Sequence, residues 1–179
     1  MEIRGYKAFN EDLSNRYGAE FKAGETYQVT GPVAFGTRGN GFHFCKRLED
    51  TLRYFDAMEG NIQIAEVIGR GNIAEYYDDY YGYYDMYAAS ELEVVKVLSR
   101  EEILVPYLIS ANYDRVKRFV SGFRLTFDEK EMFRTAFSDR KDILQAIAYY
   151  QDGIKNTYDI PSVKCYFKEK NSGRGDNNE

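Results

Sequence analysis

The sequence is poor in residues that hold disulfide-rich or metal-dependent folds together. Its 179 residues include no tryptophan, three prolines, two cysteines and one histidine. Cys45 and Cys165 are too few for a disulfide framework, so we expect two reduced thiols. His43 and Cys45 supply at most two metal ligands, whereas a structural zinc site needs four. The sequence therefore predicts no metal site.

Long apolar runs are also missing. Residues 1–9 (MEIRGYKAF) lack the hydrophobic run of a signal peptide, and no segment reaches the length that would span a membrane. We therefore expect a cytoplasmic protein.

Positive charge is scarce in the middle of the chain. The net charge is −5, but residues 49–93 alone carry eleven acidic and two basic side chains, a balance of −9. Because recognition of a duplex backbone depends on Lys and Arg, this composition argues against direct duplex binding. A basic partner protein is the better electrostatic match.

Tyrosine, in contrast, is in excess between Glu75 and Tyr87. This stretch (EYYDDYYGYYDMY) holds seven of the 17 tyrosines, four acidic residues and no basic one. Neighbouring side chains of a strand point to opposite faces, so at least half of each tyrosine pair must lie outside the core. Exposed aromatic side chains often mark interfaces. We predict a partner-binding surface made of Glu75, Tyr76, Tyr77, Asp78, Asp79, Tyr80, Tyr81, Tyr83, Tyr84, Asp85 and Tyr87.

Two other interpretations of this stretch stay open. In the first, the tyrosines belong to a plain pair of edge strands around a turn at Gly82, solvated by the aspartates. In the second, a tyrosine-rich edge forms a homodimer.

Catalytic side chains are few, and we assign none. His43 and Cys45 share a face of a predicted strand, but residues two apart lie about 6.6 Å apart along it, which is long for proton transfer. Glu91 and Glu93 also share a face, as polar alternation on a half-exposed strand would produce without any chemistry. The glycine-rich residues 36–41 (GTRGNG) lack the ending of a phosphate-binding loop and predict a hairpin loop.

The pattern of apolar residues predicts an α+β fold. Strands are expected at residues 2–9, 25–31, 41–45, 62–68 and 91–98, with one helix after residue 45 that carries Leu48, Leu52 and Phe55 on one side. Short helices follow Ser99, Asn112, Thr126 and Asp139, two of them opened by capping boxes, Ser99 with Glu102 and Thr126 with Glu129. In the third of these helices we expect Phe127, Met132, Phe133 and Phe137 to pack.

These elements group into two parts. Residues 1–98 form a mixed, mostly antiparallel β module with one helix, and residues 99–170 form a helical-hairpin region with a possible terminal strand at Val163, Cys165 and Phe167. Residues 171–179 are expected to be a disordered tail.

Several motifs resemble known families. The series GYKAFN, GETY, GFHFC and IAEVIG, over residues 5–69, resembles a poorly characterised N-terminal module of phage and mobile-element proteins. The same layout is similar to ADP-ribosyltransferases. That resemblance implies an alternative in which His43 and Glu91 are catalytic and NAD is the cofactor, although the first strand offers Tyr6-Lys7-Ala8 where such enzymes place His-Gly or an Arg.

The chain as a whole resembles type II anti-CRISPR proteins in its size, its acidity and its N-terminal module. That resemblance implies a phage- or mobile-element-encoded inhibitor that acts in a bacterial cell. It would bind Cas9 or its guide-RNA complex and would need no cofactor. The guide and target of such an effector lie in positively charged channels, which an acidic aromatic surface could enter.

Overall fold

The computed structural model describes residues 1–34, 39–52, 62–78 and 82–154. These residues belong to two compact units. The first contains Met1–Tyr107 and Gly122–Arg124, and the second contains Leu108–Ser121 and the residues from Leu125 onward. The predicted α+β class is confirmed, with an N-terminal antiparallel sheet followed by short helices.

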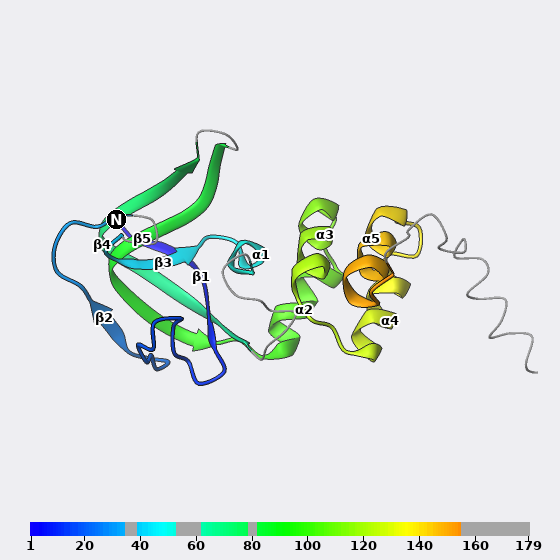
Figure 1. The fold of residues 1–179 in the computed structure, drawn as a ribbon, viewed down its shortest axis with the longest axis horizontal. Helices are drawn as coiled ribbons and strands as arrows, with labels where there is room; N and C mark the ends of the chain where they lie inside the picture. The colour runs from blue at the N-terminus through cyan, green and yellow to red at the C-terminus, as the bar shows by residue number, and fades with distance from the viewer. Residues whose placement is uncertain (35–38, 53–61, 79–81, 155–179) are drawn as a thin grey trace, which may run out of the picture. The chain divides into compact units, whose positions relative to one another are not determined.

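The first unit is built on five strands, β1 (Ile3–Asn10), β2 (Thr26–Gln28), β3 (Phe42–Cys45), β4 (Ile62–Asp78) and β5 (Gly82–Val97). All the pairings are antiparallel, in the order β2-β5-β3-β1-β4 (Figure 1). Because β4 also pairs with β5, the sheet closes on itself. β4 and β5 are much longer than the strands predicted at 62–68 and 91–98, because each continues into the tyrosine-rich stretch.

The inside of the closed sheet is the main hydrophobic core of this unit. Side chains that alternate along the strands meet there: Phe9, Phe44, Ala65, Val67, Tyr87, Ala89, Leu92 and Val94, together with Phe21 from the segment after β1. Two glycines make room for this packing. A Cβ on Gly69 would lie 2.4 Å from the Phe44 ring, and one on Gly5 would lie 2.3 Å from the carbonyl oxygen of Cys45.

Two short helices complete the first unit. In α1 (Leu48–Thr51) all four residues are buried. In α2 (Arg100–Leu108) Ile103, Leu104 and Tyr107 are buried, and Pro106 lies inside the helix. The predicted capping box is present, since Ser99 N donates to Glu102 Oε2 at 2.8 Å and Glu102 N donates to Ser99 Oγ at 3.2 Å.

The second unit is helical, with α3 (Tyr113–Gly122), α4 (Phe127–Ala136), α5 (Lys141–Ala146) and a π-helical turn, η1 (Ile147–Gln151). Its core contains Val116, Phe119, Val120, Phe133, Phe137, Ile143 and Ile147. The capping box of Thr126 and Glu129 is confirmed. The expected packing of Phe127 and Met132 is wrong, since they are 67% and 50% exposed. Phe133 and Phe137, four residues apart, define the buried face of α4, and the other two residues are about 100° or more from it.

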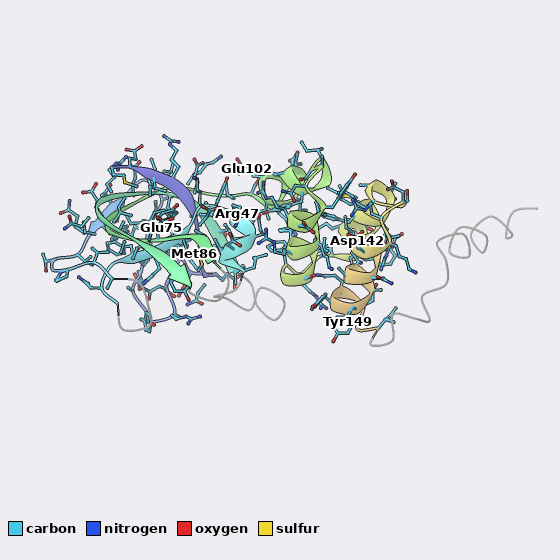
Figure 2. All side chains as sticks on the ribbon, turned by 90° about the horizontal axis from the view of Figure 1, so that it is seen from above. Arg47, Glu75, Met86, Glu102, Asp142 and Tyr149 are labelled. Carbon is cyan, nitrogen blue, oxygen red and sulfur yellow. The ribbon has the colours of Figure 1, made fainter. Side chains whose placement is uncertain are left out.

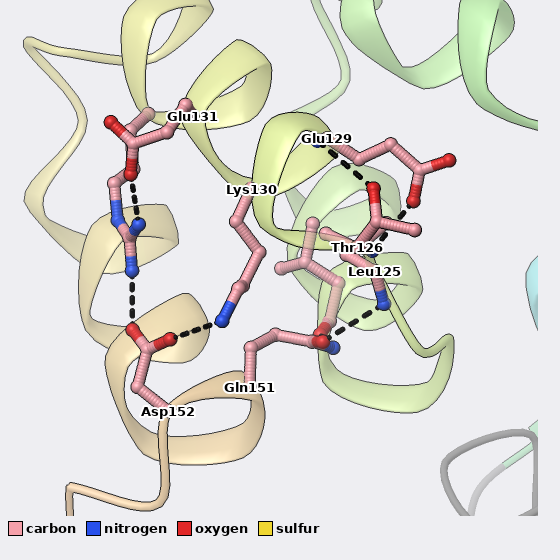
Figure 3. Close-up of polar contacts among 9 residues, drawn as sticks. Leu125, Thr126, Glu129, Lys130, Glu131, Gln151 and Asp152 are labelled. Atoms are coloured by element: carbon pink, nitrogen blue, oxygen red, sulfur yellow. Dashed lines mark hydrogen bonds and ion pairs between the residues drawn. The ribbon is translucent and has the colours of Figure 1, made fainter.

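Side chains from η1 and the residue after it hold this unit together (Figure 3). Gln151 is buried; its amide nitrogen donates to the Val120 carbonyl at 2.6 Å, and its amide oxygen accepts from Leu125 N at 3.0 Å. Asp152 accepts from Lys130 at 2.8 Å and also from Arg134. The end of α3, the start of α4 and the last turn are thereby fixed to one another.

Some expectations fall outside the described residues. They concern residues 36–38 of the glycine-rich loop, the helix beyond Leu52 including Phe55, the possible strand at Val163, Cys165 and Phe167, and the tail at 171–179. None of the described helices combines the length and the hydrophobicity of a membrane-spanning segment.

Candidate functional site

The stretch from Glu75 to Tyr87 forms the far end of the β4–β5 hairpin, and we call it the acidic hairpin. Glu75 pairs with Tyr87, Tyr77 with Tyr83 and Asp78 with Gly82. The predicted turn at Gly82 is therefore misplaced. Gly82 is the first residue of β5 and pairs with Asp78, the last residue of β4, while residues 79–81 lie outside the described residues.

The acidic hairpin extends beyond the rest of the closed sheet. β1 pairs with β4 only from Ile62 to Gly69, and β3 pairs with β5 only from Met86 to Ala89. Beyond those points the two strands continue as a two-stranded ribbon, which projects from the sheet in Figure 1.

The structure describes the side chains of four of the eleven predicted partner-binding residues. Glu75 is exposed, Tyr76 and Asp85 are half-buried and Tyr87 is buried. For Tyr77, Asp78, Tyr83 and Tyr84 it describes only the backbone, in β4 and β5, while Asp79, Tyr80 and Tyr81 lie outside the described residues.

Tyr87 belongs to the core rather than to a surface. Its ring stacks on Phe44 with a centroid distance of 5.7 Å, and its hydroxyl donates to Glu75 Oε1 at 3.4 Å. Burial, followed by the negative charges of Glu75 and Asp85, raises the pKa of the Tyr87 phenol. The phenol therefore stays protonated and can donate to Glu75.

A polar network holds the base of the acidic hairpin. Arg47, the residue before α1, lies with Nε 3.5 Å from Asp85 and 3.0 Å from Asp50, which is fully buried. The backbone adds a bond from Lys46 N to the Asp85 carbonyl at 2.7 Å. Figure 2 labels Arg47, Glu75 and Met86 in this region. Sequence reasoning missed Arg47, because its partner Asp85 is distant in sequence and nothing local marks the pairing.

A buried contact on the neighbouring residue fixes α1 to α2. The Tyr107 hydroxyl donates to Glu49 Oε2 at 2.8 Å, and both residues are almost fully buried. Because α1 carries both Glu49 and Asp50, the base of the acidic hairpin is linked through α1 to α2.

Glu91, the alternative catalytic glutamate, lies in β5 within a set of ionic contacts. Its carboxylate accepts from Gln28 at 2.8 Å and lies 3.8 Å from Arg70. Arg70 also contacts Glu2 at 2.8 Å and Glu93 at 2.7 Å. Gln28 and Arg70 each pair directly with Glu91 across the sheet, and Glu2 comes just before the pair of Ile3 with Gly69.

His43, the other alternative residue, lies in β3 opposite Ala88 of β5. Burial, with the positive charge of Lys7 as a second cause, lowers the pKa of His43, so the imidazole is neutral at pH 7. Ala88 and Glu91 are three positions apart on β5, which is about 10 Å along the strand. The sheet thus places His43 and Glu91 at separate positions.

Lys7 is a residue that sequence reasoning did not select. Its Nζ donates to the His43 carbonyl at 2.6 Å and lies 5.6 Å from the centre of the Phe9 ring. Burial lowers the pKa of Lys7 to about 8. In the described part of the chain, no group of three or more His, Cys, Asp and Glu side chains is arranged to hold a metal ion.

Comparison with known families gives a match that covers the residues of the closed sheet. A family model described as a domain of unknown function (DUF7666) matches residues 3–105, more than half of the chain. The chain belongs to the DUF7666 family. No curated protein and no solved structure gives a significant match to the chain.

The DUF7666 match runs from the start of β1 into α2 and contains the acidic hairpin, Arg47, His43 and Glu91. The helices α3, α4, α5 and η1 follow after it. The candidate surface therefore belongs to the family domain itself.

Proposed function

We propose that this DUF7666 protein is a binding protein that engages a basic, nucleic-acid-handling protein through the acidic hairpin. We propose further that it inhibits its partner, and that a Cas9-type effector or its guide-RNA complex is the first partner to examine. The acidic hairpin would occupy a channel that normally holds nucleic acid, as the resemblance to type II anti-CRISPR proteins implies.

The projection of the acidic hairpin beyond the closed sheet carries this proposal. Between Glu75 and Tyr87 the chain has four carboxylates and no basic residue, and the ribbon leaves the sheet where β1 and β3 stop pairing. A narrow ribbon with negative charge and aromatic rings can enter a groove lined by Lys and Arg. The contacts of Arg47 with Asp85 and Asp50 hold the base of this ribbon, which limits the ordering cost of binding.

The alternative of an ADP-ribosyltransferase receives less support from the contacts. The carboxylate of Glu91 is held by Gln28 and Arg70 at the surface of the sheet. A catalytic glutamate would need to face a bound substrate, and His43 lies several positions away. For this reason we favour binding over transfer of ADP-ribose from NAD.

Neutralising the acidic hairpin tests the proposal. We expect the variant with Asp78→Asn, Asp79→Asn and Asp85→Asn to bind purified Cas9, with or without guide RNA, at least about tenfold more weakly than the parent chain, because three attractions to a basic channel are lost. Binding of the parent should weaken as the salt concentration rises. Calorimetry measures the affinity, and a DNA-cleavage assay measures the inhibition.

A matched control separates the hairpin from net charge. The variant with Glu20→Gln, Glu101→Gln and Asp139→Asn changes the net charge by the same amount at exposed residues that are not part of the acidic hairpin. It should bind like the parent. Equal binding by all three proteins, with unchanged thermal unfolding, would show that the acidic hairpin is not the binding surface. Absence of any Cas9 binding by the parent would remove Cas9 as the partner.

A further inference from the structure

We infer that the basic partner binds as an extended strand that adds to the open edge of β4. By the open edge we mean residues Ile73–Glu75 on the side of β4 that faces away from β5. This inference rests on the proposed function and specifies how the partner is held.

The pairing of β4 creates the open edge. β1 covers one side of β4 up to the pair of Ile3 with Gly69, while β5 covers the other side as far as Asp78. Beyond Gly69, no strand within the described residues replaces β1. The sheet therefore ends along the side of β4 that β1 has left.

This edge offers main-chain hydrogen-bonding groups. In an antiparallel ladder, every second residue directs its N–H and C=O away from the paired strand. Among the described residues, none of the backbone hydrogen bonds outside the strand ladders involves Ile73, Ala74 or Glu75. An unpaired row of this kind is a template for another strand.

The usual protection of an exposed edge is incomplete here. Proteins protect edges with Lys, Pro, very short strands or bulges. Residues 73–78 (IAEYYD) contain neither Lys nor Pro, and β4 is 17 residues long. A register shift between Glu75 and Tyr77 adds twist but does not end the pairing with β5. Protection comes instead from negative charge, since Glu75 is exposed and residues 75–87 carry four carboxylates and no basic side chain.

Those carboxylates select the occupant. A second copy that paired its own open edge with this one would bring acidic side chains together, and like charges on adjacent strands are destabilising. A strand that carries Lys or Arg on alternate positions would place opposite charges across the same edge. Main-chain bonds would supply affinity, and the basic side chains would supply specificity.

Two synthetic peptides test the inference on the full chain. The probe is the alternating octapeptide Lys-Val-Lys-Val-Lys-Val-Lys-Val. Its twin has the same sequence and charge, but its central residues are N-methylated so that they cannot donate hydrogen bonds. We expect the twin to bind at least about tenfold more weakly, because each lost main-chain bond contributes to affinity. Binding of the probe should also slow hydrogen exchange at the Ile73, Ala74 and Glu75 amides that face the open edge.

The outcomes separate the inference from the proposed function. Equal binding of probe and twin, with loss of both in the Asp78→Asn, Asp79→Asn, Asp85→Asn variant, would overturn strand addition and keep electrostatic binding by the acidic hairpin. No binding of either peptide, or binding that ignores those substitutions, would count against both ideas. If the Ile73, Ala74 and Glu75 amides all exchange slowly before peptide is added, another part of the chain or a second copy already covers the edge, and the inference fails.

Discussion

The ammonium of Lys7 lies on the same face of β1 as the core residue Phe9. Its one hydrogen bond among the described residues is to the His43 carbonyl, and no carboxylate in that part of the chain forms an ion pair with it. Desolvation is therefore the main influence on its charge and lowers its pKa to about 8. At neutral pH the positive charge of Lys7 therefore destabilises the folded state, because it is partly removed from water without an ion-pair partner among the described residues.

This arrangement predicts an unusual pH dependence for the Lys7→Met variant. The unfolded chain keeps the Lys7 proton up to about pH 10.4, whereas the folded chain releases it near pH 8, so the parent gains stability as pH rises between these values. We expect the variant to be more stable by about 1–2 kcal/mol at pH 7, less than the full pKa shift implies, because the side chain is partly exposed and the His43 carbonyl loses its donor. The advantage should shrink towards pH 10.5 in urea unfolding curves.

Lys96 provides the control for that experiment. The hydrogen bond from Lys96 to Glu102, at 2.6 Å, is the leading cause of the raised pKa of Lys96. The stabilisation from this contact is therefore present at neutral pH and is lost as pH rises through the folded-state pKa of Lys96. The Lys96→Met variant should therefore show no advantage at pH 7. A stability difference between Lys7→Met and the parent that is constant from pH 7 to 10.5 would contradict the assignment.

The sequence contains part of this residue-scale picture. Alternation along residues 2–9 places Lys7 on the face of Phe9, but a lysine in a strand is usually assigned to solvent, so sequence reasoning passed over it. The link from Arg47 to Asp85 was equally hidden, because it depends on the register of β3 and β5. Contacts between distant residues follow from strand register, which the local sequence does not determine.

At the scale of the elements, Phe44 of β3 packs so closely on Gly69 of β4 that no side chain fits at position 69. A Cβ at position 69 would lie 2.4 Å from the Phe44 ring and 3.1 Å from the Ala89 Cβ. Any side chain at position 69 would meet this ring. β3 and β4 could then keep their present separation only if the Phe44 ring moved.

A double-mutant cycle tests this packing. We expect Gly69→Ala to destabilise the protein by about 1–3 kcal/mol through overpacking. In the Phe44→Leu background the same substitution should cost at least about 1 kcal/mol less, because the smaller side chain leaves room for the methyl group. Urea unfolding of the four proteins measures the coupling.

Gly5→Ala is the comparison within the same sheet. Its added Cβ would meet the carbonyl oxygen of Cys45, and the backbone of β3 cannot move away as a side chain can. The Phe44→Leu background should therefore relieve Gly5→Ala much less. Equal relief for both glycines would contradict a specific contact between Gly69 and Phe44.

Elements with strong local signals were the easiest to predict. Alternation identified β1, β3 and the buried parts of β4 and β5, and capping residues located the starts of α2 and α4. The length of the β4–β5 hairpin was missed, because paired tyrosines give no two-residue alternation and Gly82 suggested a turn. Phe127 and Met132 were misplaced because an apolar residue does not by itself define the buried face of a helix.

At the scale of the whole chain, the compact units do not follow the sequence order. Gly122–Arg124 belong to the sheet unit, although residues on both sides of them belong to the helical unit. Arg100 donates to the Arg124 carbonyl at 2.6 Å, and its guanidinium lies 5.0 Å from the centre of the Phe123 ring. The sequence predicts a boundary at Ser99, where strands give way to helices, but it gives no sign that Phe123 returns to the sheet unit.

Two phenylalanine substitutions in the full chain distinguish the units. Phe123 is 4% exposed and belongs to the sheet unit, whereas Phe133 is fully buried in the helical unit. Each change to Ala should cost about 3–5 kcal/mol, because it leaves a cavity in a packed core. Hydrogen exchange should locate the loss, since compact units open with free energies of their own. Phe123→Ala should speed exchange in β4 and β5, and Phe133→Ala in α3 and α5. Faster exchange of α3 and α5 alone in Phe123→Ala would assign Phe123 to the helical unit instead.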